Sequence, residues 1–339
     1  MSVALGAGPS PNPYNAHRHL LRPEEVRELS RLRVAPPLRD SALAWLEICA
    51  ALVAVAIWPT WWVVLVAVPV IGTAHYALQI LGHDAMHRRY RSDPRQNDLL
   101  ADLVLYGPVG GITHVIARNH LLHHLHLASD RDPDRHKYAT AGKATKMQLV
   151  LYLGGFSNVL PVIRNVFLRR AGDPSVERPE LTPSRAQRGA GYTGRDLAIV
   201  AGWQALLLVG MTWFIGWWAY PVLWLLPVYV FRYCADQIRQ FLEHAHLEPD
   251  EIADTHRLIT YVSSPVERIF FSPLNMNLHT AHHLWPSIPY YNLPRADRLI
   301  RERNRSPELI WRGSYLASLR DHFRALPLTP AADSGMPRP

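Results

Sequence analysis

The sequence predicts an all-α integral membrane protein with four transmembrane helices in two hairpins and a cytoplasmic helical cap that holds a metal site. Three observations predict it: two long apolar runs, basic residues that lie only outside those runs, and clustered histidines. The mean hydropathy of −0.07 conceals this pattern, because an average over 339 residues mixes apolar and polar segments.

Each apolar run is too long for one span and predicts two helices joined by a tight turn. Residues 43–81 turn at WPTWW (58–62), and residues 197–230 turn near WWAYP (217–221). About 20 helical residues cross a hydrocarbon core of about 30 Å. The aromatic residues at both turns suit the membrane interface. Two weaker apolar stretches, 98–117 and 147–163, favour interfacial or re-entrant helices over a six-span topology.

The basic residues predict the orientation. Residues 42–83 and 197–231 contain no lysine or arginine. A two-span hairpin returns the chain to the side it left, so all the basic segments face one side, which the positive-inside rule makes the cytoplasmic one. The many arginines and few lysines, with abundant alanine and proline, suggest a bacterial source and hence the bacterial cytoplasmic membrane. The net charge of +8 does not indicate nucleic-acid binding, because no basic stripe with a known fold signature accompanies it.

These patterns divide the chain into six segments, with both termini on the cytoplasmic side. They are an N-terminal cytoplasmic or interfacial segment (1–41), hairpin 1 (42–82), a cytoplasmic region with two histidine groups (83–196), hairpin 2 (197–235), a second cytoplasmic region (236–325) and a flexible tail (326–339).

Nine of the 18 histidines fall into four short groups. The groups are HDAMH at 83–87, HLLHH at 120–124, EH at 243–244 and HTAHH at 279–283. Spacings of three and four residues place side chains on one face of a helix, and the hairpin topology places all four groups on one side of the membrane. Imidazole binds zinc, copper, iron and nickel. A zinc site uses about three or four ligands, so nine histidines indicate two metal ions. The residues alone do not choose between iron and zinc.

The order of these motifs resembles the membrane-bound fatty acid desaturase and hydroxylase superfamily. The resemblance extends to NMNLHTAHHLWPSIPYYNLP at 275–294, to RQFLEH at 239–244, which is similar to the RxxxEH element of one bacterial branch, and to DPD at 132–134. It implies a four-span bundle with a cytoplasmic cap and a centre of two iron ions ligated mainly by histidine. The ligands that it implies are His83, His87, His120, His123, His124, His244, His279, His282 and His283.

Acidic residues beside the histidines are candidates to accept hydrogen bonds from ligating imidazoles. These candidates are Asp84, Asp132, Asp134 and Glu243, whereas Asn275 and Asn277 are candidates to orient the third box. Beyond the metal centre no catalytic residue is predicted. His75 is expected to be a buried, hydrogen-bonded residue, and Arg232 and Asp236 an interfacial ion pair.

The chemistry that the resemblance implies is activation of O2 followed by hydrogen abstraction from an unactivated C–H bond. Desaturation of an acyl chain is the first hypothesis, because the third-box tail is most similar to those enzymes. A hydroxylase or ketolase of a lipid, terpenoid or small acyl substrate is the alternative, and a histidine-rich metal transporter is a less favoured one. The expected partners are O2, membrane lipids and a lipid or acyl substrate.

A separate electron donor, of ferredoxin or cytochrome type with its reductase, is also expected. The string GAGYTG at 189–194 matches a dinucleotide fingerprint but precedes a membrane span instead of following a strand. The two cysteines, Cys49 and Cys234, cannot hold an iron–sulfur cluster, which needs about four.

Overall fold

The described part of the chain is mostly helical, as predicted, and it also contains a small parallel sheet. The computed structural model describes residues 12–127, 129, 131–138, 145–156, 191–245 and 258–328. The α-helices are α1 (Pro23–Leu29), α2 (Ala35–Ile57), α3 (Trp61–Met86), α4 (Pro94–Leu100), α5 (Thr113–His126), α6 (Arg135–Tyr138), α7 (Lys146–Leu153), α9 (Gly194–Phe214), α10 (Ala235–His244), α11 (Pro265–Phe271), α12 (His279–Leu284), α13 (Leu293–Arg303) and α14 (Tyr315–Ala325). Short 3-10 helices are η1 (Pro13–Leu20), η3 (Gly107–Val109) and η8 (Tyr290–Asn292), and π-helices are η2 (Ala101–Tyr106), η5 (Pro221–Leu225) and η6 (Val228–Cys234).

Three helices of the described chain, α2, α3 and α9, are long and apolar enough to cross a membrane. A fourth candidate is the bent pair Pro94–Val109 and Thr113–His126, which meet at 94°. The bend lies in the stretch predicted to be interfacial or re-entrant. Gly110 stands there at φ +82°, a left-handed conformation that favours glycine. The second weak stretch continues beyond the described residues at 157–163.

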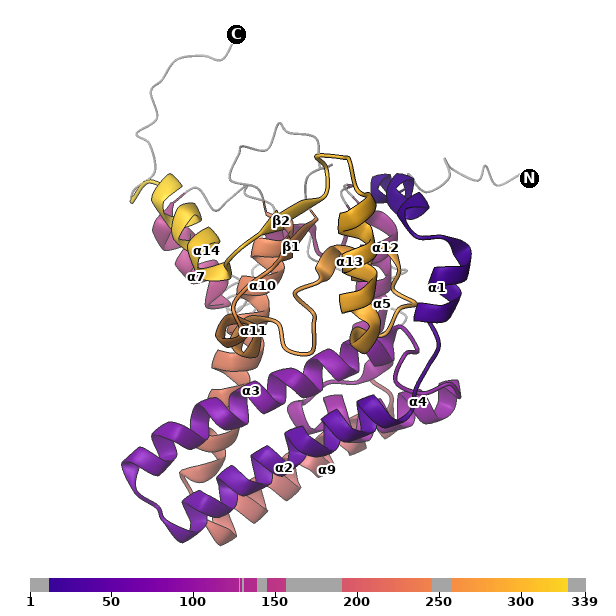
Figure 1. Cartoon of the computed structure of the whole chain (residues 1–339). Coiled ribbons are helices and arrows are strands. Elements are labelled where there is room, and N and C mark those ends of the chain that lie inside the picture. The colour runs from indigo at the N-terminus through magenta and orange to yellow at the C-terminus, as the bar shows by residue number, and fades with distance from the viewer. Residues whose placement is uncertain are drawn as a thin grey trace, which may run out of the picture.

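Helices α2 and α3 form an antiparallel pair below the cap, and α9 lies beside α2 (Figure 1). Helices α2 and α3 are joined by a turn at 58–60, inside the predicted turn. Trp45 of α2 stacks on Trp203 of α9, with ring centroids 5.7 Å apart. After α9, residues 219–244 are helical throughout, but much of this segment is π-helical. Pro221 and Pro227 lack the backbone N–H that an α-helix needs, and π-helical turns are frequent at functional sites.

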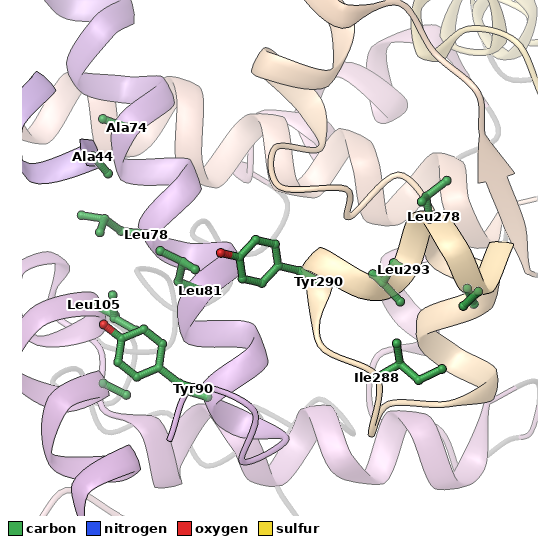
Figure 2. Packing of buried hydrophobic residues seen from close by; sticks show 14 of the residues in the cluster. Ala44, Ala74, Leu78, Leu81, Tyr90, Leu105, Leu278, Ile288, Tyr290 and Leu293 are labelled. Carbon is green, nitrogen blue, oxygen red and sulfur yellow. The ribbon is translucent and has the colours of Figure 1, made fainter. Parts of the chain in front are cut away.

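One apolar core joins the long helices to the cap. Figure 2 shows Leu78 and Leu81 of α3 on one side and Leu278 and Leu293 of the cap on the other, with Tyr290 between them. Burying each such side chain contributes about 1.5–3 kcal/mol. The core therefore fixes the end of α3, which carries the first histidine box, against the segment that carries the third.

Strands β1 (Ile259–Tyr261) and β2 (Ile310–Arg312) pair in parallel, with Ile259 opposite Ile310. The sheet ties the segment before the third box to the C-terminal helix. Asn277 extends this link, because its side-chain amide donates to the carbonyl of Tyr261 over 2.7 Å.

The N-terminal segment is held on the cap by an ion pair between Glu25 of α1 and Arg303 of α13. The two guanidinium nitrogens of Arg303 donate to the two carboxylate oxygens over 2.6 and 2.7 Å. This side-chain hydrogen bond, with one from the backbone N–H of Arg22, lowers the pKa of Glu25 from 4.5 to about 2.

This pair predicts a small, pH-dependent contribution to stability. The Arg303→Gln variant should lower the free energy of unfolding at neutral pH, by no more than an exposed ion pair contributes. Because the folded-state pKa of Glu25 is depressed, the contribution is present above pH 4.5 and is lost as the pH falls towards 2. Thermal unfolding at a series of pH values measures it. The Arg324→Gln variant, at an exposed position of α14, is the control and should show no acid-dependent change. A loss in Arg303→Gln that does not shrink in acid would contradict the assignment.

Candidate metal centre

The nine histidines lie together in the cap and divide into two adjacent clusters. Cluster A contains His83, His87, His120, His124 and His282, and cluster B contains His123, His244 and His283. Within each cluster, one ring nitrogen from every histidine lies within 4.8 Å of the others. The ninth, His279, adjoins cluster B, with its Nε2 2.9 Å from that of His244. The clusters meet at His124 and His283, whose rings stack with their centroids 4.1 Å apart.

The position of a histidine within its box determines which cluster it joins. Histidines four residues apart stay on the same side: His120 with His124 in cluster A, and His279 with His283 at cluster B. The middle histidine of each HxxHH box, three residues after the first, crosses to the other cluster: His123 to cluster B and His282 to cluster A. Neighbouring residues differ by about 100° around a helix, so His123 and His124 face different clusters. Each HxxHH box therefore serves both clusters, whereas its spacing had predicted a single shared face.

The nitrogen positions in cluster A fit metal ligands better than a hydrogen-bonded set of rings. The Nε2 atoms of His87 and His120 are 2.8 Å apart, those of His120 and His124 3.0 Å, and those of His124 and His282 3.1 Å. A neutral ring nitrogen either donates one hydrogen or accepts, so these three consecutive contacts cannot all be full hydrogen bonds. Nitrogens bound at about 2.1 Å to one ion, at right angles, lie ~3.0 Å apart.

Several buried ring nitrogens have no protein partner in the described chain. They include the Nδ1 atoms of His83, His124 and His282 and both ring nitrogens of His283. A buried polar atom without a partner is costly. Burial, followed by the charge of neighbouring groups, holds the pKa of His279, His282 and His283 well below the usual value. These rings are therefore neutral, as metal ligation requires.

Asp132 orients a histidine of cluster B. Nδ1 of His123 lies 2.9 Å from both carboxylate oxygens of Asp132. Tyr138 donates its hydroxyl to the same carboxylate, and so does the backbone N–H of Asp134 over 2.8 Å. A carboxylate on Nδ1 fixes the tautomer and leaves Nε2 available for a metal.

Glu243 supports the other end of cluster B. One of its oxygens lies 3.2 Å from Nδ1 of His279 and accepts from Arg239 over 2.8 Å, while the second accepts from the hydroxyl of Tyr315 over 2.7 Å. Arg239 also donates to Asp236 over 2.8 Å and to the hydroxyl of Tyr76 over 2.9 Å. All of these side chains are buried. The network links the helix that bears His244 to α3 and α14.

Three of the four remaining polar candidates hydrogen-bond to backbone groups. The Asp84 carboxylate accepts the backbone N–H of Tyr290 over 2.9 Å, so it ties the first box to the third-box tail, and among the described residues it makes no hydrogen bond to an imidazole. Asn277 binds strand β1, and Asn275 donates to the carbonyl of Tyr290 over 3.3 Å. Asp134 lies at the wall of the cavity that adjoins the clusters.

Two expectations outside the boxes need correction. His75 is buried, but neither ring nitrogen has a hydrogen-bond partner in the described chain, and the ring packs edge-on against Trp224 at 4.3 Å. The expected ion pair of Arg232 with Asp236 is replaced by one between Arg239 and Asp236. The glycine fingerprint lies partly outside the described residues, because Gly189 is not among them.

Sequence reasoning missed three residues of this site. Arg239 was noted only as part of a motif, although its spacing of four residues from Glu243 is that of an ion pair on a helix. Tyr138 and Tyr315 gave no signal, because each reaches the site from a distant segment.

A cavity of about 510 Å³ opens beside both clusters. The histidines in its wall are His83, His120, His123, His244, His279 and His283. The wall thus contains histidines of both clusters. The wall is mixed, because Ile80, Met86 and Ile116 stand beside polar and charged side chains.

The Asp132→Asn variant tests the orienting role of this carboxylate. Losing the charge on the partner of His123 should lower metal affinity by about tenfold to a hundredfold. The measurement is the metal retained at increasing chelator concentrations. The exposed carboxylate Asp321 supplies the control, Asp321→Asn, which should retain metal like the unaltered protein. Equal retention by Asp132→Asn would remove the assignment.

Comparison with known proteins agrees with this site. The family model described as fatty acid desaturase matches residues 59–313. A Nostoc protein named as an sn-1 acyl-lipid omega-3 desaturase (ferredoxin) is 24% identical over 268 residues, covering 74% of this chain and 72% of its own length. A chloroplastic omega-3 fatty acid desaturase of Brassica napus is 25% identical over 258 residues, covering 71% of this chain and 60% of its own length. These matches confirm the predicted resemblance and do not favour a metal transporter. The chain belongs to the fatty acid desaturase family.

Proposed function

We propose that this protein is an O2-dependent, membrane-embedded desaturase of acyl chains with a centre of two iron ions. The observation that carries the proposal is the division of nine imidazoles into two adjacent clusters that open on one cavity. A single structural metal would need only about four ligands. Imidazole-rich ligation with open positions suits iron that reacts with O2.

The two clusters would hold one iron ion each. Cluster A offers five histidines, and cluster B offers three, with His279 beside them as a further ligand. The iron ions, when bound, supply the activation of O2 that allows hydrogen to be removed from an unactivated C–H bond.

The chain's own residues position the reactants. Asp132 holds His123 in place by a hydrogen bond, and a carboxylate oxygen of Glu243 lies 3.2 Å from Nδ1 of His279. Burial restricts the movement of the rings. The cavity would hold part of an acyl chain against histidines of both clusters, and the bound chain would limit the access of water. Removal of two hydrogens gives an alkene, whereas transfer of oxygen gives an alcohol, so the placement of the C–H bond decides the product.

We place the protein in the bacterial cytoplasmic membrane as two hairpins, with the metal cap and both termini on the cytoplasmic side. Helices α2, α3 and α9 and the helical residues 219–235 would be the four spans. The segment boundaries predicted at 42–82 and 197–235 support this division. The lack of basic residues in 42–83 and 197–231 supports the orientation.

Electrons would come from a separate donor protein. Reduction of O2 to water takes four electrons and desaturation provides two, so two more are required. The chain has two cysteines and no cluster motif that could hold its own redox centre. The Nostoc relative is named with ferredoxin, and a positively charged cap suits an acidic donor of this kind.

Expression with a compatible ferredoxin and its reductase, followed by mass analysis of lipids and fatty acids, tests the proposal. We expect a product two hydrogens lighter than its substrate and about two iron ions per purified chain. A product heavier by one oxygen would identify a hydroxylase instead. Zinc as the sole bound metal, in protein prepared without added zinc, would overturn the iron assignment.

A further inference from the structure

Arg232 lies within the proposed fourth span and lines the same cavity as the histidine clusters. Charged residues inside membrane spans are costly and usually face a functional cavity. The Nε atom of Arg232 is buried and has no hydrogen-bond partner in the described chain. Arg232 thus presents a guanidinium at the cavity wall, and its Nε has no partner among the described residues.

The acidic neighbours of Arg232 are engaged elsewhere. Asp236, one helical turn further along, accepts from Arg239 over 2.8 Å and from Tyr76 over 3.2 Å, and it also accepts from Gln240. Asp134, the other carboxylate of the wall, has interactions of its own. Gln79 of α3 and Asn119 of α5 add neutral polar groups to the same wall.

These features do not suit a cavity filled by plain hydrocarbon. An apolar chain packed against Arg232 would remove the guanidinium from water and offer it no hydrogen bond. A carboxylate is the natural partner, because the planar guanidinium fork matches its two oxygens. The amides of Gln79 and Asn119 can also donate hydrogen bonds to such a group.

We propose that Arg232 binds the carboxylate of the substrate, which is therefore a fatty acid with a free acid group and not an acyl chain esterified in a neutral lipid. This inference rests on the proposed function of the same cavity and adds the class of substrate. Because the cavity also contacts both clusters, Arg232 sets how far from the carboxyl group the acyl chain meets the metal centre.

Binding of saturated fatty acids and of their methyl esters tests the inference, since the ester keeps the chain and loses the charge. Calorimetric titration of the purified iron-loaded protein, at a fixed concentration of non-ionic detergent, gives both affinities. The ratio of acid to ester affinity should fall by about tenfold to a hundredfold in Arg232→Gln, the range expected for a hydrogen bond to a charged group. Comparing ratios between variants cancels the partition of each probe into micelles.

The controls separate recognition from folding. The Arg324→Gln variant, at an exposed position of α14, should keep the ratio of the unaltered protein. Arg232→Lys keeps the charge without the fork and should give an intermediate ratio, which also serves if Arg232→Gln does not fold. The iron content of each variant shows whether its metal centre is intact, and thermal unfolding shows whether the variant is folded.

An unchanged ratio in Arg232→Gln would overturn the inference, and so would an equal loss of affinity for acid and ester. The assay does not depend on turnover. Desaturation of a neutral acyl lipid together with an unchanged ratio would contradict this inference alone. A clear effect on the ratio in a protein that oxidises no substrate would contradict the proposed function alone.

Discussion

Replacing His283 with alanine is expected to abolish product formation and to reduce the iron content from about two ions per chain to about one. His283 is 4% exposed, and neither of its ring nitrogens has a protein partner in the described chain. Its loss leaves cluster B with His123 and His244 and the adjoining His279, at the lower limit of about three ligands for a bound ion.

The corresponding experiment on cluster A replaces His87 with alanine. His87→Ala removes one of five histidines, so we expect it to abolish activity with a smaller loss of iron than His283→Ala. The control is His19→Ala, because His19 is exposed, lies outside the boxes and hydrogen-bonds to the carbonyl of Ala16. Iron analysis and product analysis of the three variants complete the comparison. Full activity with two irons in His283→Ala would refute the assignment of cluster B.

Replacing Arg239 with leucine is expected to destabilise the protein by about 3–5 kcal/mol. Arg239 is 4% exposed and binds Glu243, which is fully buried, and Asp236, which is 9% exposed. Removing the cation leaves two buried carboxylates without their partner, and the cost of such an uncompensated charge is of this size. Arg239→Lys should cost less, since it keeps the charge but loses the fork that reaches both carboxylates.

An exposed pair on α1 provides the control for Arg239. Arg27 pairs with Glu24 at the i,i+3 spacing that also joins Arg239 to Asp236, but both side chains are exposed, 76% and 71%. Arg27→Leu should therefore cost less than about 1 kcal/mol. Thermal unfolding in detergent compares the two variants. Equal losses of stability in the two variants would show that the Arg239 network contributes no more to stability than an exposed ion pair. A larger loss of iron in Arg239→Leu would add that the network supports cluster B through Glu243.

The local features of the site could be predicted from the sequence. Boxes 83–87, 120–124 and 279–283 have the spacing of helical metal ligands, and their number indicated two metal ions. The position of Asp132 shortly after the second box made it a candidate to support a histidine, and the structure places it 2.9 Å from His123. Each of these inferences depends on residues that are close in the chain, where the helical period determines which side chains are neighbours.

Inferences that needed a distant partner were less successful. Asp84 was assigned to a histidine, but it accepts the N–H of Tyr290 from the cap. Asp236 was paired with Arg232 on spacing alone, and either Arg232 or Arg239 could reach it along the helix. Tyr76 of α3 donates to Asp236 and accepts from Arg239, and Glu243 also binds Arg239. This set of contacts favours Arg239.

The sequence by itself determined the helical membrane class, the family and the nine histidines, because each follows from composition or from spacings within one helical segment. Only the tertiary structure decided that His123 joins His244 and His283 while His282 joins the first-box histidines. Which cluster the middle histidine of a box reaches depends on how α5 and α12 are placed around α3 and α10. That placement is set by packing between residues far apart in the chain, and it also brings Arg232 to the wall of the cavity.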